Sequence, residues 1–147
     1  MKRIFLLILC PFCLPNPWAD VILAIPRLTV GFWLATRFGW DKFPTPEWFV
    51  QDVAKLGFPI PFAFAWAAVL SEVIGGGCLV LGLCTRFSGF AIGATMLVAV
   101  FMQKTHAPLW EKLPALGCLW VALYAVVLGS GRFGLDRFLC RLRHEAA

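Results

Sequence analysis

The sequence predicts an all-α integral membrane protein, a bundle of four transmembrane helices. Of its 147 residues, 61% are hydrophobic and only 14% are charged, and the mean hydropathy is +0.82. This composition excludes an ordinary soluble domain. The apolar residues fall in four stretches separated by proline, glycine and charged residues, as in a chain that crosses a hydrocarbon core of about 30 Å several times.

The first span is predicted at residues 21–38 and carries an arginine in its first turns. Arg27, Gly31, Ala35, Phe38 and Lys42 follow one another at three- and four-residue steps, so they share one helix face. An arginine this deep either reaches back to the lipid headgroups or pairs with an acid inside the bundle.

The second span, residues 61–83, organises the chain. It is apolar except for Ser71 and Glu72. A carboxylate near mid-span costs about 2.5–3.5 kcal/mol or more to place in lipid, so Glu72 is predicted to face the bundle interior, as a structural ion pair or as a functional carboxyl. Glu72 is the one acid inside a predicted span, which makes Arg27 its expected partner. The residues on its face are small and permit close helix approach: Ala65, Ala68, Gly75 and Gly76.

A short amphipathic helix is predicted at residues 47–56, between the first two spans. Its apolar and polar residues separate in a way that is typical of a helix lying flat at the membrane surface. Such a helix is either a lid over the mouth of the bundle or a plain interfacial loop.

The third and fourth spans are predicted at residues 88–102 and 113–128. His106 lies between them, on the same membrane side as Lys42 if the helices alternate. Lys42 and His106 are therefore candidates for binding a polar headgroup at the outer mouth. The fourth span carries alanines, Cys118 and Gly129 at helical spacing, a small-residue packing face.

Residues 1–20 form an N-terminal extension or signal-like segment, in which a basic pair precedes a short apolar run. A cleaved signal and a membrane-surface extension are both open. Pro17 departs from the small-residue pattern of a cut after Ala19, which favours retention. The Cys10–Cys13 pair has the spacing of thiol redox or metal-binding motifs, but it lacks their flanking context and is predicted to be dispensable. A membrane domain at 21–138 and a basic cytoplasmic tail at 139–147 complete the chain.

The distribution of basic residues predicts how the chain is oriented in the membrane rather than a binding partner. The formal net charge is +5, but Lys and Arg gather at helix ends and in the tail, where they meet anionic headgroups, and no nucleic-acid partner is expected. The bias between the two sides favours cytoplasmic termini in a bacterial inner membrane. The six cysteines do not suggest a disulfide framework, since Cys78 and Cys118 lie inside apolar spans. The sequence contains no zinc quartet and no haem-type CxxCH, so no metal or haem is expected.

Several of these segments, taken in order, resemble the DoxX family of small four-helix membrane proteins. The matching residues are Arg27 with Gly31, GWDK at 39–42, SEVIGG at 71–76, LGLCTR at 81–86, and GSG at 129–131 with Leu135 and Asp136. The resemblance covers about residues 24–138. It implies a connection to thiosulfate:quinone oxidoreductase, as its membrane subunit, and to oxidative and thiol stress systems beside soluble redox partners.

Three functions follow from these observations. In the first, a redox-linked membrane subunit binds a quinone or similar headgroup between its helices, with Glu72 and Arg27 as catalytic residues and Lys42 and His106 at the outer mouth. A quinone or a partner protein would then carry the electrons. In the second, the protein is a non-catalytic anchor or assembly partner. In the third, it is a small transporter with Glu72 along the path.

Overall fold

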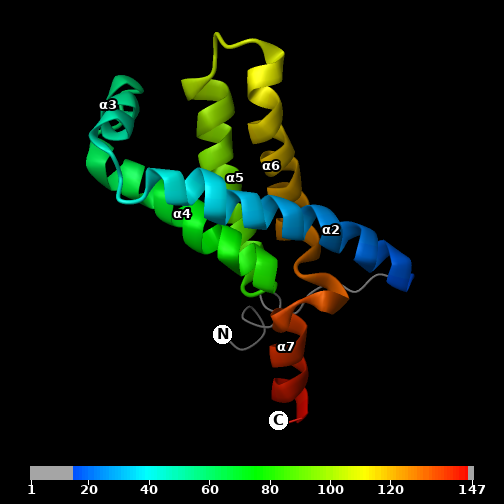
Figure 1. The fold of residues 1–147 in the computed structure, drawn as a ribbon. Coiled ribbons are helices and arrows are strands. Elements are labelled where there is room, and N and C mark those ends of the chain that lie inside the picture. The colour runs from blue at the N-terminus through cyan, green and yellow to red at the C-terminus, as the bar shows by residue number, and fades with distance from the viewer. Residues whose placement is uncertain (1–14, 146–147) are drawn as a thin grey trace.

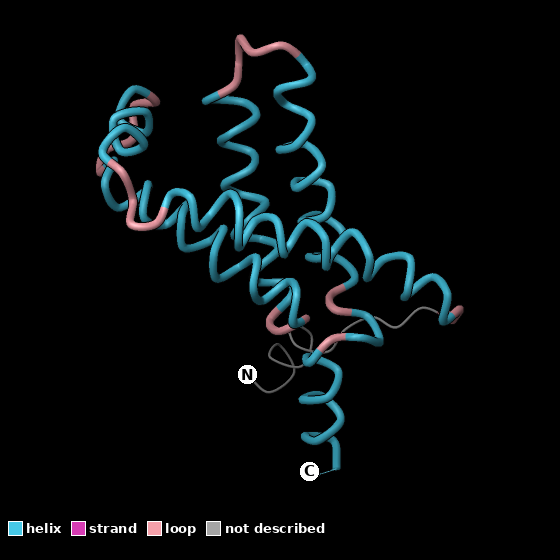
Figure 2. Tube along the Cα trace, viewed as in Figure 1, coloured by secondary structure: helices cyan, strands magenta, loops and turns pink. Residues whose placement is uncertain are grey.

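The computed structural model describes residues 15–145 and confirms the all-α prediction: within that range there are helices, turns and no strand. Figures 1 and 2 show that helix accounts for most of the described chain and that the first span crosses the last two spans at a steep angle. Four helical segments are long and apolar enough to cross a membrane: Trp18–Lys42, Pro61–Leu81, Thr85–Gln103 and Leu109–Leu128.

The first span consists of α2, Pro17–Trp33, and a continuation with different helical geometry. Asn16 caps α2 by accepting a hydrogen bond from the backbone N–H of Trp18 at 3.0 Å. A π-helical segment, η1 (Leu34–Gly39), and a 3₁₀ turn, η2 (Trp40–Lys42), then extend the helix past the predicted end at residue 38. The first span therefore ends at Lys42.

The short amphipathic helix predicted in the first connection is α3, Glu47–Lys55. Its apolar residues Phe49 and Val53 are buried against Ala65 and Val69 of α4 (Pro61–Leu81). Figure 1 shows α3 beside the N-terminal end of α4. The segment is therefore an ordered helix packed on the bundle.

Helices α4, α5 (Thr85–Val98) and α6 (Leu109–Leu128) form the other three spans. A π-helical segment, η3 (Ala99–Gln103), extends α5. The fourth span begins before the predicted residue 113, because its first turn includes Glu111 and Lys112, which conceal a helix start from a search for apolar runs.

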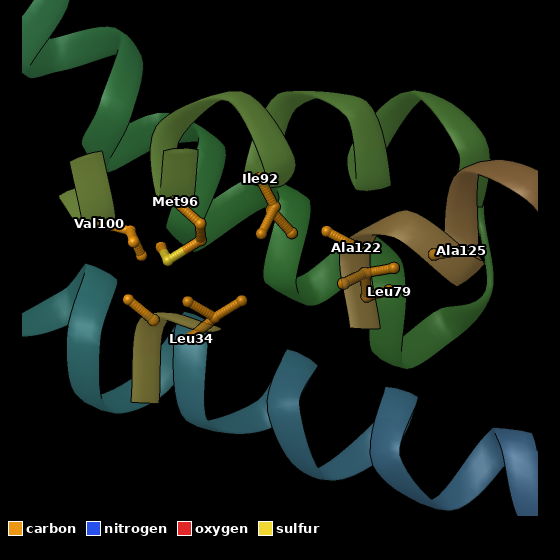
Figure 3. Packing of buried hydrophobic residues seen from close by; sticks show 8 residues of the cluster. Leu34, Leu79, Ile92, Met96, Val100, Ala122 and Ala125 are labelled. Carbon is orange, nitrogen blue, oxygen red and sulfur yellow. The ribbon is translucent and has the colours of Figure 1, made fainter. Parts of the chain in front are cut away.

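The core lies where the four spans meet (Figure 3). Its buried residues come from every span: Leu34, Leu79, Ile92, Met96, Val100, Ala115, Ala122 and Ala125. The α2 and α4 backbones touch, since a Cβ on Gly76 would lie 2.8 Å from both the Gly31 carbonyl oxygen and the Ala35 nitrogen. Gly76 thus lies on a close-packing face, as predicted.

The chain after α6 also folds as helix. A 3₁₀ turn, η4 (Gly131–Phe133), leads into α7, Leu135–Glu145, which extends below the bundle in Figure 1. Cys140 in α7 is disulfide-bonded, whereas Cys78, Cys84 and Cys118 are free thiols. The signal-like segment up to residue 14 and its CPFC motif lie outside the described residues.

Candidate functional site

Glu72 lies inside the bundle, as predicted, but its partner is Lys42. The Lys42 ammonium donates hydrogen bonds to both carboxylate oxygens, at 2.7 and 3.0 Å. The Glu72 side chain is 7% exposed and the Lys42 side chain 22% exposed. A charged pair this deep in a membrane-spanning bundle is a candidate site, because ionisable residues within membrane segments are rarely placed there without a functional or structural reason.

The extension of the first span places Lys42 beside Glu72. Gly39 in η1 lies against α4, where a Cβ would come within 2.9 Å of the Val73 nitrogen. The end of the first span is therefore level with Glu72. The Phe49 ring of α3 lies against the Lys42 ammonium, 5.2 Å from nitrogen to ring centroid, which is cation–π geometry.

Two cavities meet at this ion pair. The larger has a volume of about 380 Å³ and lies between α3, α4 and the α5–η3 segment. The smaller, of about 110 Å³, lies between η1, η3 and α6. Four residues line both cavities: Lys42, Glu72, Ala99 and Gln103. The pair thus stands at the junction of two spaces.

The larger cavity has the character of a small-molecule site. Aromatic and aliphatic side chains make most of its wall, and α3 contributes Phe49, Val53 and Leu56. The polar exceptions near the ion pair are Gln103 and the hydroxyls of Ser71 and Thr95. An apolar space with a few convergent polar groups suits an apolar ligand that carries a polar head.

Arg27 does not belong to this site, and the predicted pairing of Arg27 with Glu72 is wrong. Arg27 is 2% exposed, and its guanidinium donates to the backbone carbonyl of Ser130 at 2.6 Å. It is level with Gly82, whose Cβ would lie 3.0 Å from Arg27 Nη1. Ten helical residues, about 15 Å, separate Gly82 from Glu72. An arginine side chain cannot cross that distance.

Arg27 instead belongs to a second polar cluster, at the end of the bundle where α7 begins. There Asp20 forms a 2.9 Å ion pair with Arg132, and the Tyr124 hydroxyl donates to the Leu23 carbonyl at 2.9 Å. These contacts join the start of α2 to α6 and to the turn that follows it. The cluster therefore holds the start of the first span against the end of the fourth.

Asp136 fastens the first turn of α7 to this end of the bundle. Its carboxylate accepts hydrogen bonds from the Cys84 N–H at 2.6 Å, the Thr85 N–H at 3.0 Å and the Thr85 hydroxyl at 2.9 Å. The Asp136 carboxylate thereby accepts hydrogen bonds from backbone N–H groups at the start of α5, which have no partner within the helix. Sequence reasoning assigned no role to Asp20 or Asp136, because each lies outside the apolar runs.

The structure does not bring His106 to the ion pair. His106 is exposed, and it lines neither cavity. Gln103, three residues earlier, occupies the wall beside Lys42 and Glu72 and was missed. Its position as the first polar residue after the third span was the available indication. Among the described residues, no group of three or more His, Cys, Asp or Glu side chains is arranged to hold a metal ion.

Comparison with known proteins places the chain in a family. The DoxX family model matches residues 22–105, which include Lys42, Glu72 and Gln103. An uncharacterized protein of Haemophilus influenzae is 30% identical, over 78% of this chain and 83% of its own length. The Bacillus subtilis protein named "Putative oxidoreductase CatD" is 29% identical, over 69% of this chain and 75% of its own length. No solved structure matches. The chain belongs to the DoxX family of multi-pass membrane proteins.

Proposed function

We propose that this protein is the membrane subunit of a redox-linked system and that the Lys42–Glu72 pair binds the headgroup of a lipid-soluble redox carrier, a quinone. The observation that supports the proposal is the 2.7 Å ion pair on the wall of an apolar cavity of about 380 Å³ within the membrane spans. The similarity to the Bacillus subtilis protein named "Putative oxidoreductase CatD" points in the same direction.

The residues present fit such a headgroup. The Lys42 ammonium can donate to a carbonyl oxygen, and the Glu72 carboxylate can accept from a hydroxyl, so the pair suits both the oxidised and the reduced form. Ser71 and Thr95 offer hydroxyls on the same cavity wall. When bound, a quinone supplies two-electron chemistry coupled to proton uptake or release. The second partner would be a soluble redox protein that exchanges electrons with it.

In this proposal Arg27 positions helices and does not touch the ligand. Its buried hydrogen bond to Ser130 holds α2 against the turn after α6, far from the larger cavity. Lys42 takes the role first assigned to Arg27, as the cation that balances Glu72.

We further propose a bacterial cytoplasmic membrane with both termini in the cytoplasm. The Lys and Arg bias supports this orientation. The disulfide at Cys140 opposes it, because disulfides persist mainly in oxidising compartments. A single reporter cysteine at Arg141, an exposed position of α7, in a chain whose other cysteines are replaced by serine, distinguishes the two in intact cells. Labelling of that cysteine by a membrane-impermeant reagent would show that the C-terminus lies outside the cytoplasm and would contradict the proposed orientation.

The ligand is tested by purifying the protein from native membranes in mild detergent and extracting bound quinone for mass spectrometry. The wild type should retain quinone in a fixed ratio to protein. The charge-free variant Lys42→Met/Glu72→Gln should fold and lose it. The exposed Lys55–Asp52 pair on α3, with 2.8 Å between nitrogen and oxygen, provides a matched control. Lys55→Met/Asp52→Asn should retain the quinone.

The same variants separate the other two functions. Absence of quinone from the wild type, together with growth of a deletion strain on the folded charge-free variant, would favour the anchor. Absence of quinone from the wild type, together with solute uptake that the wild type supports and the charge-free variant does not, would favour the transporter. Either result would overturn the redox proposal.

A further inference from the structure

The two cavities that meet at the ion pair differ in size, with volumes of about 380 Å³ and about 110 Å³. The larger is covered by α3 and is mostly apolar. The smaller is lined by Lys42, Glu72, Gln103, Lys104 and Cys118 among apolar residues. The smaller cavity, at about 110 Å³, is below the roughly 300–1,000 Å³ of ligand pockets, so the ligand proposed for the larger cavity does not account for it.

The smaller cavity meets the requirements of a hydrated space. Its volume of about 110 Å³ is several times the roughly 10–15 Å³ that one water molecule needs, and its polar side chains provide the two to four partners that a buried water requires.

This cavity also leads toward the aqueous phase at the α5–α6 turn. Gln103 is exposed and Lys104 is half-buried, and the Lys104 ammonium donates to the Glu111 carbonyl across the turn at 2.7 Å. Gln103 lines both cavities. Its amide therefore lies between the ion pair and the outside.

We propose that the smaller cavity is a water-filled vestibule through which Glu72 exchanges protons with the aqueous phase at the α5–α6 turn, with Gln103 as the positioning residue at its mouth. A ligand that takes the hydrogen bonds of Lys42 would leave the Glu72 carboxylate without its counter-charge. A proton from the aqueous phase, relayed along the vestibule water, then binds a Glu72 carboxylate oxygen. The other charged or titratable groups along this wall are Lys42, Lys104 and Cys118.

The use of that proton rests on the proposed function, whereas hydration of the vestibule does not. Footprinting with hydroxyl radicals made from water by X-rays tests hydration in the purified full chain. Cys118 and the buried Met96 line the vestibule, and Cys78 lines neither cavity. Cys118 and Met96 should be oxidised several-fold faster than Cys78. Equal rates for Cys118 and Cys78 would mean a dry cavity and overturn the vestibule, whether or not quinone is bound.

Two variants test whether Gln103 controls the access of water to the vestibule. Gln103→Leu should slow oxidation of Met96 and Cys118 several-fold, and Gln51→Leu, at an exposed position of α3 away from both cavities, should not. Unchanged rates in Gln103→Leu, with helical content preserved, would remove Gln103 from the route.

The proton route is followed by infrared spectroscopy after a pH jump in Lys42→Met, in which Glu72 has lost its counter-charge. The carboxyl band that disappears in Lys42→Met/Glu72→Gln reports Glu72. Its protonation should be several-fold slower in Lys42→Met/Gln103→Leu than in Lys42→Met. Equal rates would refute exchange through the vestibule.

Discussion

Removing Lys42 should lower the free energy of unfolding more than removing Glu72, because the two side chains are not equally buried. Lys42→Met leaves the Glu72 carboxylate, whose side chain is 7% exposed, without a cation. Loss of one partner from a buried pair costs about 3–5 kcal/mol in the free energy of unfolding. In Glu72→Gln the Lys42 ammonium, with 22% of its side chain exposed, can still reach water, and the amide keeps one acceptor oxygen. We expect about 1–3 kcal/mol for this variant.

The double variant Lys42→Met/Glu72→Gln leaves no unbalanced charge. Its loss of stability should therefore be smaller than the sum of the two single losses, with a coupling energy of about 2–3 kcal/mol. Reversible unfolding in mixed micelles, followed by circular dichroism, measures all four proteins of the cycle. The exposed Lys55–Asp52 pair should give a coupling of about 0–1 kcal/mol in the same assay.

Two results would refute this reasoning. Additive losses at Lys42 and Glu72 would mean that the pair does not form in the folded protein. A coupling between Arg27 and Glu72 as large as that between Lys42 and Glu72 would mean that the two polar clusters are not separate. The structure predicts near additivity for Arg27→Met with Glu72→Gln, since these residues have no shared partner.

Three further predictions concern packing and the α4–α5 turn. Gly76→Ala should lower the free energy of unfolding by about 1–3 kcal/mol, because its Cβ would meet the α2 backbone, whereas Gly77→Ala, with open space around it, should be neutral or slightly stabilising in the same unfolding assay. Asp136→Asn should cost about 1–3 kcal/mol in that assay, because it weakens three hydrogen bonds to the start of α5. Burial, then the charge of Asp136 and the nearby thiol of Cys78, raise the pKa of the Cys84 thiol above its usual value. Less thiolate is then present at neutral pH, so alkylation of Cys84, followed by mass spectrometry, should be slower than that of a free thiol and should increase over a more alkaline pH range.

The four spans, the short helix after the first span and the burial of Glu72 were predictable from the sequence, because each depends on local composition. Apolar runs must leave water, and a carboxylate within such a run must face protein or water. The small residues around Glu72 likewise indicated a close helix contact, which Gly76 makes with the α2 backbone. These conclusions required no knowledge of which residues from distant segments meet.

The identity of the partner of Glu72 was decided by tertiary structure. Arg27 and Lys42 lie on one predicted face of the first span, and either charge could balance the carboxylate. The choice depends on the depth at which α2 crosses α4 and on the π and 3₁₀ turns of η1 and η2, which carry Lys42 to the level of Glu72. The sequence shows the face of a helix on which a residue lies, but the depth at which two helices meet is set by packing between residues far apart in the chain. The same packing brings Gln103 to the site and leaves His106 outside it.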